Sequence, residues 1–179
     1  MSRDPKYDIL FEPVRIGPVT APNRFFQVPH CNVLGHGRPR AEAANRAVKA
    51  EGGWGVICTQ ETEIHPSADI TPYIEGRIWD DRDIPQHRLM TDAVHEHGAL
   101  AGIELAYNAS HAPNLYSRIA PMSPGSNPVH GVHPVYARAM TKRDIADVRR
   151  WHVEAARRAQ RAGYDIVYVY AGHDMSLLQ

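Results

Sequence analysis

The sequence predicts an α/β fold built on parallel strands. Short apolar runs typical of strands recur along the chain, and segments with apolar residues three and four positions apart, typical of helices, separate them. Four strands and three helices alternate strictly. A helical connection between neighbouring strands of one sheet makes those strands parallel, with right-handed crossovers. A chain of 179 residues is long enough for one domain with its own hydrophobic core.

The extended segments are placed by apolar composition and by the turns around them. Residues 11–23 are rich in Pro and Gly, and the break at Gly17-Pro18 predicts a small hairpin ahead of the main fold. The four strands are expected over residues 24–28, 55–59, 100–105 and 164–170.

Three helices are expected between these strands, each with a start or stop signal. The first covers residues 41–51 and ends at Gly52-Gly53. Asp83 is expected to cap the second helix, which runs to His97. The third begins at Thr141-Lys-Arg-Asp144, which resembles a capping box with Asp in place of Glu.

The connection over residues 108–140 stands out by its length. It is rich in Pro, Gly and Ser, and it is longer than the plain connections of compact domains. A functional role is therefore expected for this segment.

Charge and composition exclude several classes of function. Lys plus Arg and Asp plus Glu both number 20, so no net field favours nucleic acid or an anionic membrane. No apolar run approaches the ~20 residues of a membrane span, and the N-terminus lacks the apolar region of a signal peptide. The 2 cysteines form no CxxC and no disulfide framework, so a reducing, cytoplasmic location is expected. The 11 histidines include no HExxH or comparable ligand set, so no metal site is expected.

Two architectures fit the alternating pattern. An open doubly wound sheet calls for a Gly-rich phosphate turn after strand one, and the sequence there, Pro-His-Cys-Asn-Val-Leu-Gly-His-Gly, does not match GxGxxG. A (β/α)8 barrel calls for eight strands and typically ~250 residues. In the barrel interpretation the chain is the N-terminal half: four parallel βα units, preceded by a small β-hairpin, with the barrel not closed.

Polar or reactive side chains follow all four expected strands. Strand one ends at Cys31, strand two at Gln60-Glu61, strand three at Glu104 and Tyr107, and strand four at Tyr170 and His173. In barrels, catalytic groups stand at the C-terminal ends of the strands. Loops are polar in any case, so each of these residues also has a plain structural explanation.

Cys31 and Glu104 carry the strongest local signals. Cys58 lies inside an apolar strand and is expected to be inert packing, whereas Cys31 lies beyond its strand, beside His30, which favours a reactive thiol. Glu104 interrupts an apolar strand. A buried carboxylate there needs either a salt bridge or an N–H donor from a ligand.

The fourth strand end carries a tyrosine pair and a histidine. Tyr168 and Tyr170 are two residues apart and share one face of the strand. Tyr168 is expected in the core, and Tyr170 in the core or in a site. His173 taken alone is typical of a loop.

Six segments resemble one known family. They are residues 23–31 (Asn-Arg-Phe-Phe-Gln-Val-Pro-His-Cys), 49–54, 77–80, 98–105, 111–114 and 165–170. Together they resemble the trimethylamine dehydrogenase branch of the old yellow enzyme superfamily, which also holds the dimethylamine and histamine dehydrogenases. The similarity spans residues 3–179, nearly without gaps.

The resemblance implies a (β/α)8 barrel that binds FMN at its C-terminal mouth. Cys31 matches the cysteine that forms a 6-S-cysteinyl bond to the FMN ring. Some ene-reductases of the superfamily have a non-covalent cysteine at the same place, but the Pro-His-Cys context favours the covalent link. Glu104 matches a carboxylate that hydrogen-bonds the pyrimidine edge of the flavin. Pro29, His30 and Tyr107 complete the expected cofactor-binding set.

Tyr170 and His173 match the active-site tyrosine and histidine of the family and are the expected catalytic pair. Ene-reductases typically have His-x-x-His or His-x-x-Asn here, to hold a carbonyl oxygen. Tyr-x-x-His suits amine oxidation, because His173 can influence the ionisation of Tyr170 and help present a neutral amine. The implied activity is oxidation of a small amine with electron transfer to FMN; the alternative is an NAD(P)H-dependent ene-reductase.

Glu61 and Gln60 are the expected substrate-pocket residues, and Glu61 departs from the family. Trimethylamine dehydrogenase has an aromatic residue at the position of Glu61, and its dimethylamine relative has Gln. The cation–π contribution of that wall is therefore missing. A carboxylate could instead pair with a cationic substrate or accept an N–H, unless it turns aside into a salt bridge.

The enzymes of the family are longer than this sequence. Their barrel continues through four more strands, followed by the cysteines of a [4Fe–4S] cluster and nucleotide-binding domains. Residues 1–179 are therefore expected to be one partial FMN-binding domain, an N-terminal fragment that is inactive alone; a non-catalytic product is a further alternative. For the whole enzyme the resemblance implies an electron-accepting protein partner and a homo-oligomer.

Overall fold

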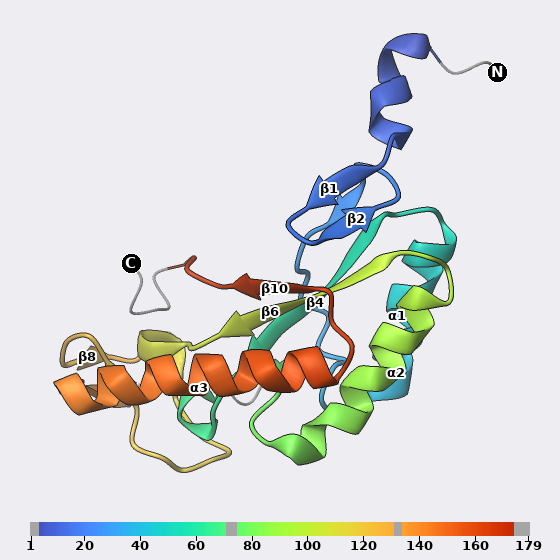
Figure 1. Ribbon diagram of the computed structural model, residues 1–179. Coiled ribbons are helices and arrows are strands. Elements are labelled where there is room, and N and C mark those ends of the chain that lie inside the picture. Colours follow the sequence, from blue (N-terminus) through green and yellow to red (C-terminus); the bar gives the residue numbers. More distant parts are fainter. Residues whose placement is uncertain (1–3, 71–74, 131–133, 174–179) are drawn as a thin grey trace.

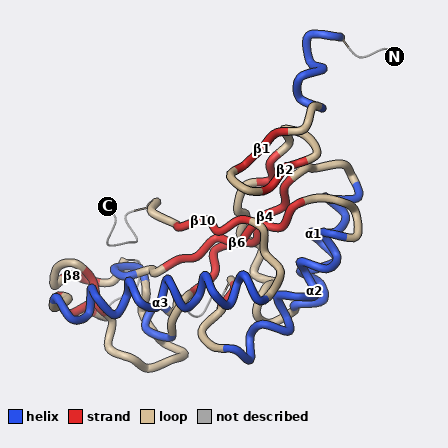
Figure 2. Tube along the Cα trace, viewed as in Figure 1, coloured by secondary structure: helices blue, strands red, loops and turns tan. Residues whose placement is uncertain are grey.

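The computed structural model describes residues 4–70, 75–130 and 134–173. A parallel sheet lies at its centre, with the three long helices on one side and a small hairpin near one end (Figure 1). The 3-10 helix η1 (Pro5–Phe11) projects beyond this hairpin, as the trace in Figure 2 shows.

The strands of the central sheet are parallel and follow one another in chain order. They are β3 (Phe26–Gln27), β4 (Val56–Glu63), β6 (Leu100–Ala106) and β10 (Ile166–Val169). The connecting helices are α1 (Pro39–Glu51), α2 (Ile84–His95) and α3 (Lys142–Arg161). The predicted series of parallel βα units is confirmed. Within the described residues the sheet does not close, because β3 and β10 are both edge strands.

Shorter elements complete the fold. The predicted hairpin consists of β1 (Val14–Ile16) and β2 (Val19–Ala21), and β5 (Gly76–Arg77) pairs with the end of β4. The long connection before α3 contains the 3-10 turn η4 (Ala109–His111) and the short strands β7 (Met122–Ser123), β8 (Asn127–Pro128) and β9 (Tyr136–Ala139). These strands pair with one another, so the connection is a structured insertion.

Strands β4 and β6 form the buried centre of the sheet. Every residue of β4 is buried, and β6 approaches it closely at Gly102, where a Cβ atom would lie 2.5 Å from the Cys58 sulfur. A side chain at Gly102 would therefore collide with the Cys58 thiol, which would have to move. Cys58 is fully buried, as predicted, and burial raises the pKa of its thiol to about 12.

The two predicted helix caps have different outcomes. The capping box of the third helix is confirmed: Asp144 N–H donates to Thr141 Oγ1 at 3.2 Å, and Thr141 N–H donates to the Asp144 carboxylate at 2.7 Å. Asp83 is the N-cap residue of the second helix, as predicted, but its side chain makes no capping hydrogen bond to that helix. The chain enters α2 through the 3-10 turn η3 (Asp81–Asp83), which Asp80 caps, and the Asp83 carboxylate accepts the Asp80 N–H within that turn.

Two features are missing from the described parts of the chain. None of the helices there is both long enough and apolar enough to cross a membrane. No group of three or more His, Cys, Asp or Glu side chains there is placed to hold a metal ion.

Candidate active site

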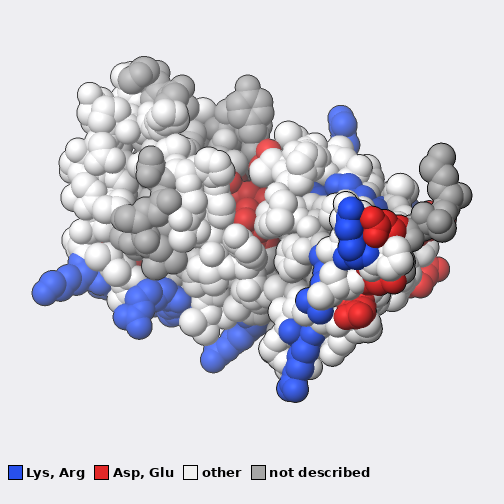
Figure 3. All heavy atoms as spheres, turned by 90° about the horizontal axis from the view of Figure 1, so that it is seen from above, with Lys and Arg blue, Asp and Glu red and all other residues white. Residues whose placement is uncertain are grey.

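A cavity opens where the carboxyl ends of the central strands meet. Its volume is about 540 Å³, which lies in the range of small-molecule sites. The lining residues are Val28, Pro29, Cys31, Glu61, Glu104, His111, His130, Tyr168, Tyr170 and His173. Figure 3 shows the molecule from above, relative to the view of Figure 1. Asp and Glu atoms lie near the middle of this face, between uncharged residues. Each of the four strands thus contributes to the walls, as expected for a site at the mouth of a barrel.

Cys31 stands in the loop after β3 with its thiol at the cavity wall. The residue is exposed, but partial burial of the sulfur raises the pKa of the thiol to about 11. The carboxylates of Glu75, Glu61 and Glu104 add to the increase, while the backbone N–H of Glu61 opposes it. The thiol is therefore protonated at neutral pH, and a reaction through its thiolate needs a base or a bound ligand that changes this environment.

Glu61 and Glu104 are neighbours across β4 and β6. They are directly paired in register, after an irregularity in β4 between Cys58 and Glu61. Glu61 is only 6% exposed, and its Oε1 has no hydrogen-bond partner in the structure. Burial raises the pKa of both carboxyl groups to about 7, and the charge of Glu61 adds to the increase at Glu104. Near neutral pH the pair can hold a proton, accept an N–H, or face a cation.

Tyr170 and His173 form a hydrogen-bonded pair at the end of β10. The Tyr170 hydroxyl contacts Nδ1 of His173, and the ring centroids are 5.8 Å apart. The intervening turn is tight, because a Cβ atom at Gly172 would lie 3.1 Å from the Tyr170 ring. His173 has a φ of 57°, so the backbone turns back and brings the imidazole to the phenol. The pair places a proton-transfer couple at the cavity wall.

Four lining residues are not singled out as site residues by the sequence: Val28, His111, His130 and Tyr168. The rings of His111 and His130 stack with centroids 4.6 Å apart, and both belong to the long connection, whose length is their only sequence signal. Tyr168 was expected in the core but is 44% exposed, because β10 is an edge strand of the described sheet.

Gln60 and His30 do not present their side chains to the cavity. The Gln60 amide is buried on the helix side of β4, where it donates to the Glu75 carbonyl at 3.3 Å and accepts from Arg46 at 3.1 Å. The expectation that Gln60 lines the substrate pocket is corrected accordingly. His30 contributes its backbone carbonyl, which also accepts from Arg46, at 2.7 Å.

Tyr107 also lies away from the cavity. Its hydroxyl shares a hydrogen bond with Ser67 Oγ at 3.1 Å, and its ring centroid lies 6.0 Å from that of Trp151 on α3. It belongs to the hydrophobic core between sheet and helices. Tyr107, expected in the cofactor-binding set, is therefore not among the residues that line this cavity.

The lining of the cavity suits a flavin ring. Val28 and Pro29 offer apolar surface, and the carboxylates of Glu104 and Glu61 offer acceptors for ring N–H groups, including the unpartnered Glu61 Oε1. The Cys31 thiol stands on the same wall. No Lys or Arg occurs among the lining residues that the structure describes. This part of the chain therefore provides walls for a ring rather than a cradle for a phosphate.

Known proteins resemble the chain in both sequence and structure. The NADH:flavin oxidoreductase / NADH oxidase family matches residues 9–179. The chain is 42% identical to dimethylamine dehydrogenase of Hyphomicrobium sp. (strain x), over 100% of this chain and 25% of that protein. It superimposes on histamine dehydrogenase from Rhizobium sp. 4-9 with a TM-score of 0.93 and 53% identity, covering 98% of this chain and 27% of that one. With 6-hydroxypseudooxynicotine amine oxidase from Pseudomonas geniculata N1 the TM-score is 0.94 and the identity 49%, covering 98% and 26%.

The chain belongs to the NADH:flavin oxidoreductase / NADH oxidase family, a class of flavin-linked oxidoreductases. Within this class its similar relatives include the dimethylamine and histamine dehydrogenases, so the predicted resemblance is confirmed. The chain spans 25% to 27% of the length of the three relatives described above. The sheet matches the N-terminal part of a (β/α)8 barrel, which confirms the half-barrel over the open doubly wound sheet.

The buried carboxyl group of Glu61 should make stability depend on pH. Its pKa rises from 4.5 to about 7, chiefly through burial. Between these values the folded protein holds a proton that the unfolded chain has released, so the free energy of unfolding falls as pH rises through that window. Glu61→Gln is neutral throughout and should weaken this slope, with a gain of roughly 1–3 kcal/mol above pH 7.

Urea unfolding at about pH 5 and about pH 8 measures this effect. Glu51→Gln is the matched control, because Glu51 is an exposed glutamate at the end of α1. Equal losses of stability with pH in wild type, Glu61→Gln and the control would show that Glu61 is ionised in the folded protein.

Proposed function

We propose that the cavity is the ring-binding part of an FMN site, and that the whole protein oxidises a small amine. One observation carries the proposal: the Cys31 thiol, the Glu104 carboxylate and the Tyr170–His173 pair all line one cavity in a chain of a flavin oxidoreductase family. In this proposal Cys31 forms a thioether with the flavin ring, and Glu104 accepts a ring N–H. The bound flavin supplies a two-electron acceptor.

The Tyr170–His173 pair has the chemistry to prepare an amine for oxidation. An amine gives up a hydride equivalent only from its neutral form, because the lone pair stabilises the developing iminium. The Tyr170 hydroxyl, hydrogen-bonded to His173 Nδ1, can take the ammonium proton and pass it toward the imidazole. Amine oxidation therefore uses both members of the pair.

Ene reduction is the second candidate, because the chain belongs to the family of the NADH:flavin oxidoreductases. That reaction needs donors that hold a carbonyl oxygen at this position. The phenol of Tyr170 is hydrogen-bonded to the imidazole of His173, and such a pair suits proton removal better. The relatives of highest similarity described above include two named as amine dehydrogenases, and amine oxidation is the function supported best.

Anaerobic mixing of the flavin-loaded protein with each substrate class tests the proposal. A small amine should bleach the flavin absorbance within the first turnover. In the converse experiment, an enone should fail to reoxidise flavin that NADPH has reduced. Rapid reduction by NADPH followed by reoxidation with an enone, and no bleaching by amines, would establish the ene-reductase.

The Glu61 carboxylate favours, as substrates, amines with a second positively charged or N–H-bearing group. Its carboxylate lines the cavity and has one unpartnered buried oxygen, which such a group could satisfy. Glu61→Gln should weaken binding of a diamine or of histamine by roughly 1.5–3 kcal/mol, the range of a charged hydrogen bond. Glu61→Tyr should recover preference for small methylated amines through a cation–π wall.

A panel of trimethylamine, dimethylamine, histamine and longer diamines, run against wild type and both variants, measures this. If all three proteins rank the panel in the same order, Glu61 does not contact the substrate.

For the whole protein the proposal extends to further parts. An electron-accepting protein, a [4Fe–4S] cluster, nucleotide-binding domains and a homo-oligomer belong to it as implications of the family resemblance. A cytoplasmic location belongs to it because the 2 cysteines form no disulfide framework. The relatives have about three quarters of their length outside the region that this chain matches.

A further inference from the structure

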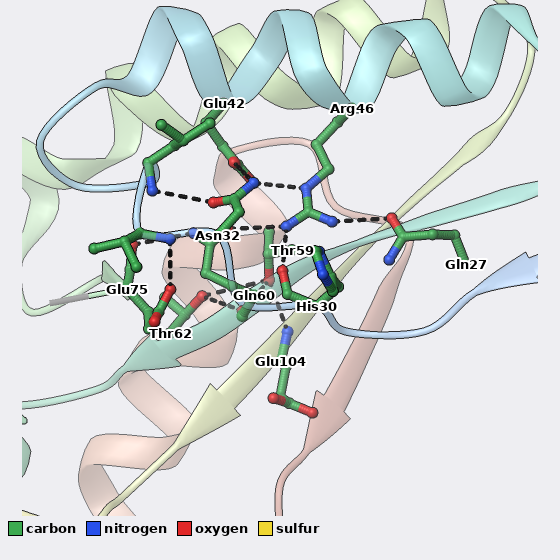
Figure 4. A network of polar contacts seen from close by, with 12 residues as sticks. Gln27, His30, Asn32, Glu42, Arg46, Thr59, Gln60, Thr62, Glu75 and Glu104 are labelled. Atoms are coloured by element: carbon green, nitrogen blue, oxygen red, sulfur yellow. Dashed lines mark hydrogen bonds and ion pairs between the residues drawn. The ribbon is translucent and has the colours of Figure 1, made fainter. Parts of the chain in front are cut away.

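Arg46 is an unusual residue for the interior of this fold. It lies on α1, faces the sheet, and is 0% exposed. Its guanidinium donates to Glu42 Oε1 at 2.7 Å and to Gln27 Oε1 at 3.0 Å (Figure 4). A buried ion pair generally adds little stability over an apolar pair of the same size. The presence of a charged pair here therefore calls for another explanation.

The Glu42–Arg46 pair is attached to both neighbours of Cys31. On one side, Arg46 Nη2 donates to the His30 carbonyl at 2.7 Å. On the other side, the Asn32 side-chain amide donates to Glu42 Oε2 at 2.7 Å. Figure 4 shows His30 and Asn32 converging on this pair from the loop after β3. The backbone is thus held immediately before and immediately after the thiol-bearing residue.

The loop beyond Cys31 is held in an unfavourable backbone conformation. Val33 has a φ of 56°, in the left-handed region that β-branched residues avoid. Its N–H donates to Glu75 Oε2 at 2.9 Å, and Asn32 Oδ1 accepts the Leu34 N–H at 3.0 Å. The backbone of Val33 therefore does not take this conformation by its own preference; a hydrogen bond to the side chain of Glu75 outside the loop and one to that of Asn32 within the loop support it.

Cys31 itself is exposed, so packing around the residue does not fix it. The direction of its Sγ depends on the backbone of residues 30–32. We propose that the buried Glu42–Arg46 pair is a positioning device that aims the Cys31 thiol into the cavity for attachment to the flavin ring. This inference rests on the covalent link of the proposed function.

Attachment replaces the thiol hydrogen and one ring hydrogen by a carbon–sulfur bond. That change is a two-electron oxidation; the oxidised flavin ring accepts the electrons, and dioxygen takes them up afterwards with the two protons. A misplacement of about 1 Å can slow a reaction about 10²-fold. The position of the Cys31 sulfur should therefore affect the rate of attachment far more than the affinity for flavin.

Three variants separate positioning from folding. Asn32→Ala cuts the attachment to Glu42, together with the hydrogen bond from the Leu34 N–H to Asn32 Oδ1, and leaves the ion pair intact. The double variant Glu42→Leu with Arg46→Met removes the pair without leaving a lone buried charge. Arg40→Met is the matched control, because Arg40 is an exposed arginine on the same helix. Thermal unfolding of each variant shows whether it is folded.

Two readouts are taken on these proteins. The first is the rate at which apo-protein mixed with FMN acquires flavin that survives denaturation, measured by intact mass. It should fall at least about tenfold in Asn32→Ala and in the double variant, and stay at the wild-type value in Arg40→Met. The second is alkylation of Cys31 by iodoacetamide in flavin-free protein, with buried Cys58 as internal reference. Release of the loop exposes the sulfur to water and lowers the pKa of the thiol, so alkylation should accelerate at least about threefold.

The two readouts distinguish this inference from the proposed function. Wild type that acquires no covalent flavin would contradict the thioether, and the alkylation comparison would then decide the positioning role by itself. Folded variants with wild-type alkylation rates, and wild-type attachment rates where attachment occurs, would overturn the positioning role.

Discussion

Tyr170→Phe is expected to slow flavin reduction by the amine roughly 10²–10⁴-fold, the usual contribution of a positioned acid–base group. The variant removes only the hydroxyl that contacts His173 Nδ1 and keeps the ring in the cavity wall. The proton of the bound ammonium then has no acceptor at this position. Substrate affinity should change much less, because the loss falls on a step after binding.

Single-turnover reduction under anaerobic conditions, over a range of amine concentrations, separates the rate from the affinity. Tyr168→Phe is the matched control, because Tyr168 lies in β10, two residues before Tyr170, and lines the same cavity. A change of less than about threefold for Tyr170→Phe, no larger than that of the control, would return Tyr170 to a packing role.

Cys31→Ala should eliminate covalently bound flavin while leaving FMN bound reversibly. The rest of the cavity wall, including Glu104 and Pro29, remains in this variant, so the ring keeps most of its contacts. Acid precipitation should leave the yellow colour with the wild-type pellet and release it from the variant to the supernatant. Cys58→Ala is the control, since that thiol is buried away from the cavity.

Release of the colour from wild type as well would identify Cys31 as a thiol that contacts the flavin without bonding to it. The ene-reductase alternative would then gain support. Retention of the colour by Cys31→Ala would place the attachment on another residue.

Apolar periodicity and strand order were sufficient to predict the parallel sheet and its helices, because both depend on local pattern and on connection rules. Element ends were harder. β4 runs to Glu63 rather than residue 59, because tertiary burial, not propensity, carries the strand through a polar stretch. Asp83 is the N-cap residue of α2, but its carboxylate accepts N–H groups of the preceding 3-10 turn instead of capping the helix.

The side of the sheet to which each site residue points could be predicted only in part. Alternation along a strand assigns sides only when the strand is regular, and β4 has a register shift between Cys58 and Glu61. That shift turns Glu61 to the cavity and Gln60 to the helices. No pattern in the sequence shows it.

Contacts between residues far apart in the sequence were the hardest features to predict. The contacts that join Arg46 to Gln27, His30 and Gln60 span 14 to 19 residues of sequence. An arginine in a helix predicts a solvated face, and its complete burial follows only from how α1 lies on the sheet. The stacked His111 and His130 likewise depend on how the long connection folds over the strand ends.

In the proposed site the cavity holds a flavin ring bonded to Cys31. Peptide mass mapping of the flavin-loaded protein after proteolysis in the dark tests it most directly. We expect the peptide containing Cys31 to be heavier by one FMN less two hydrogen atoms, and the Cys58 peptide to be unmodified. A Cys31 peptide of unmodified mass, together with protein-bound FMN that washes out on denaturation, would contradict it.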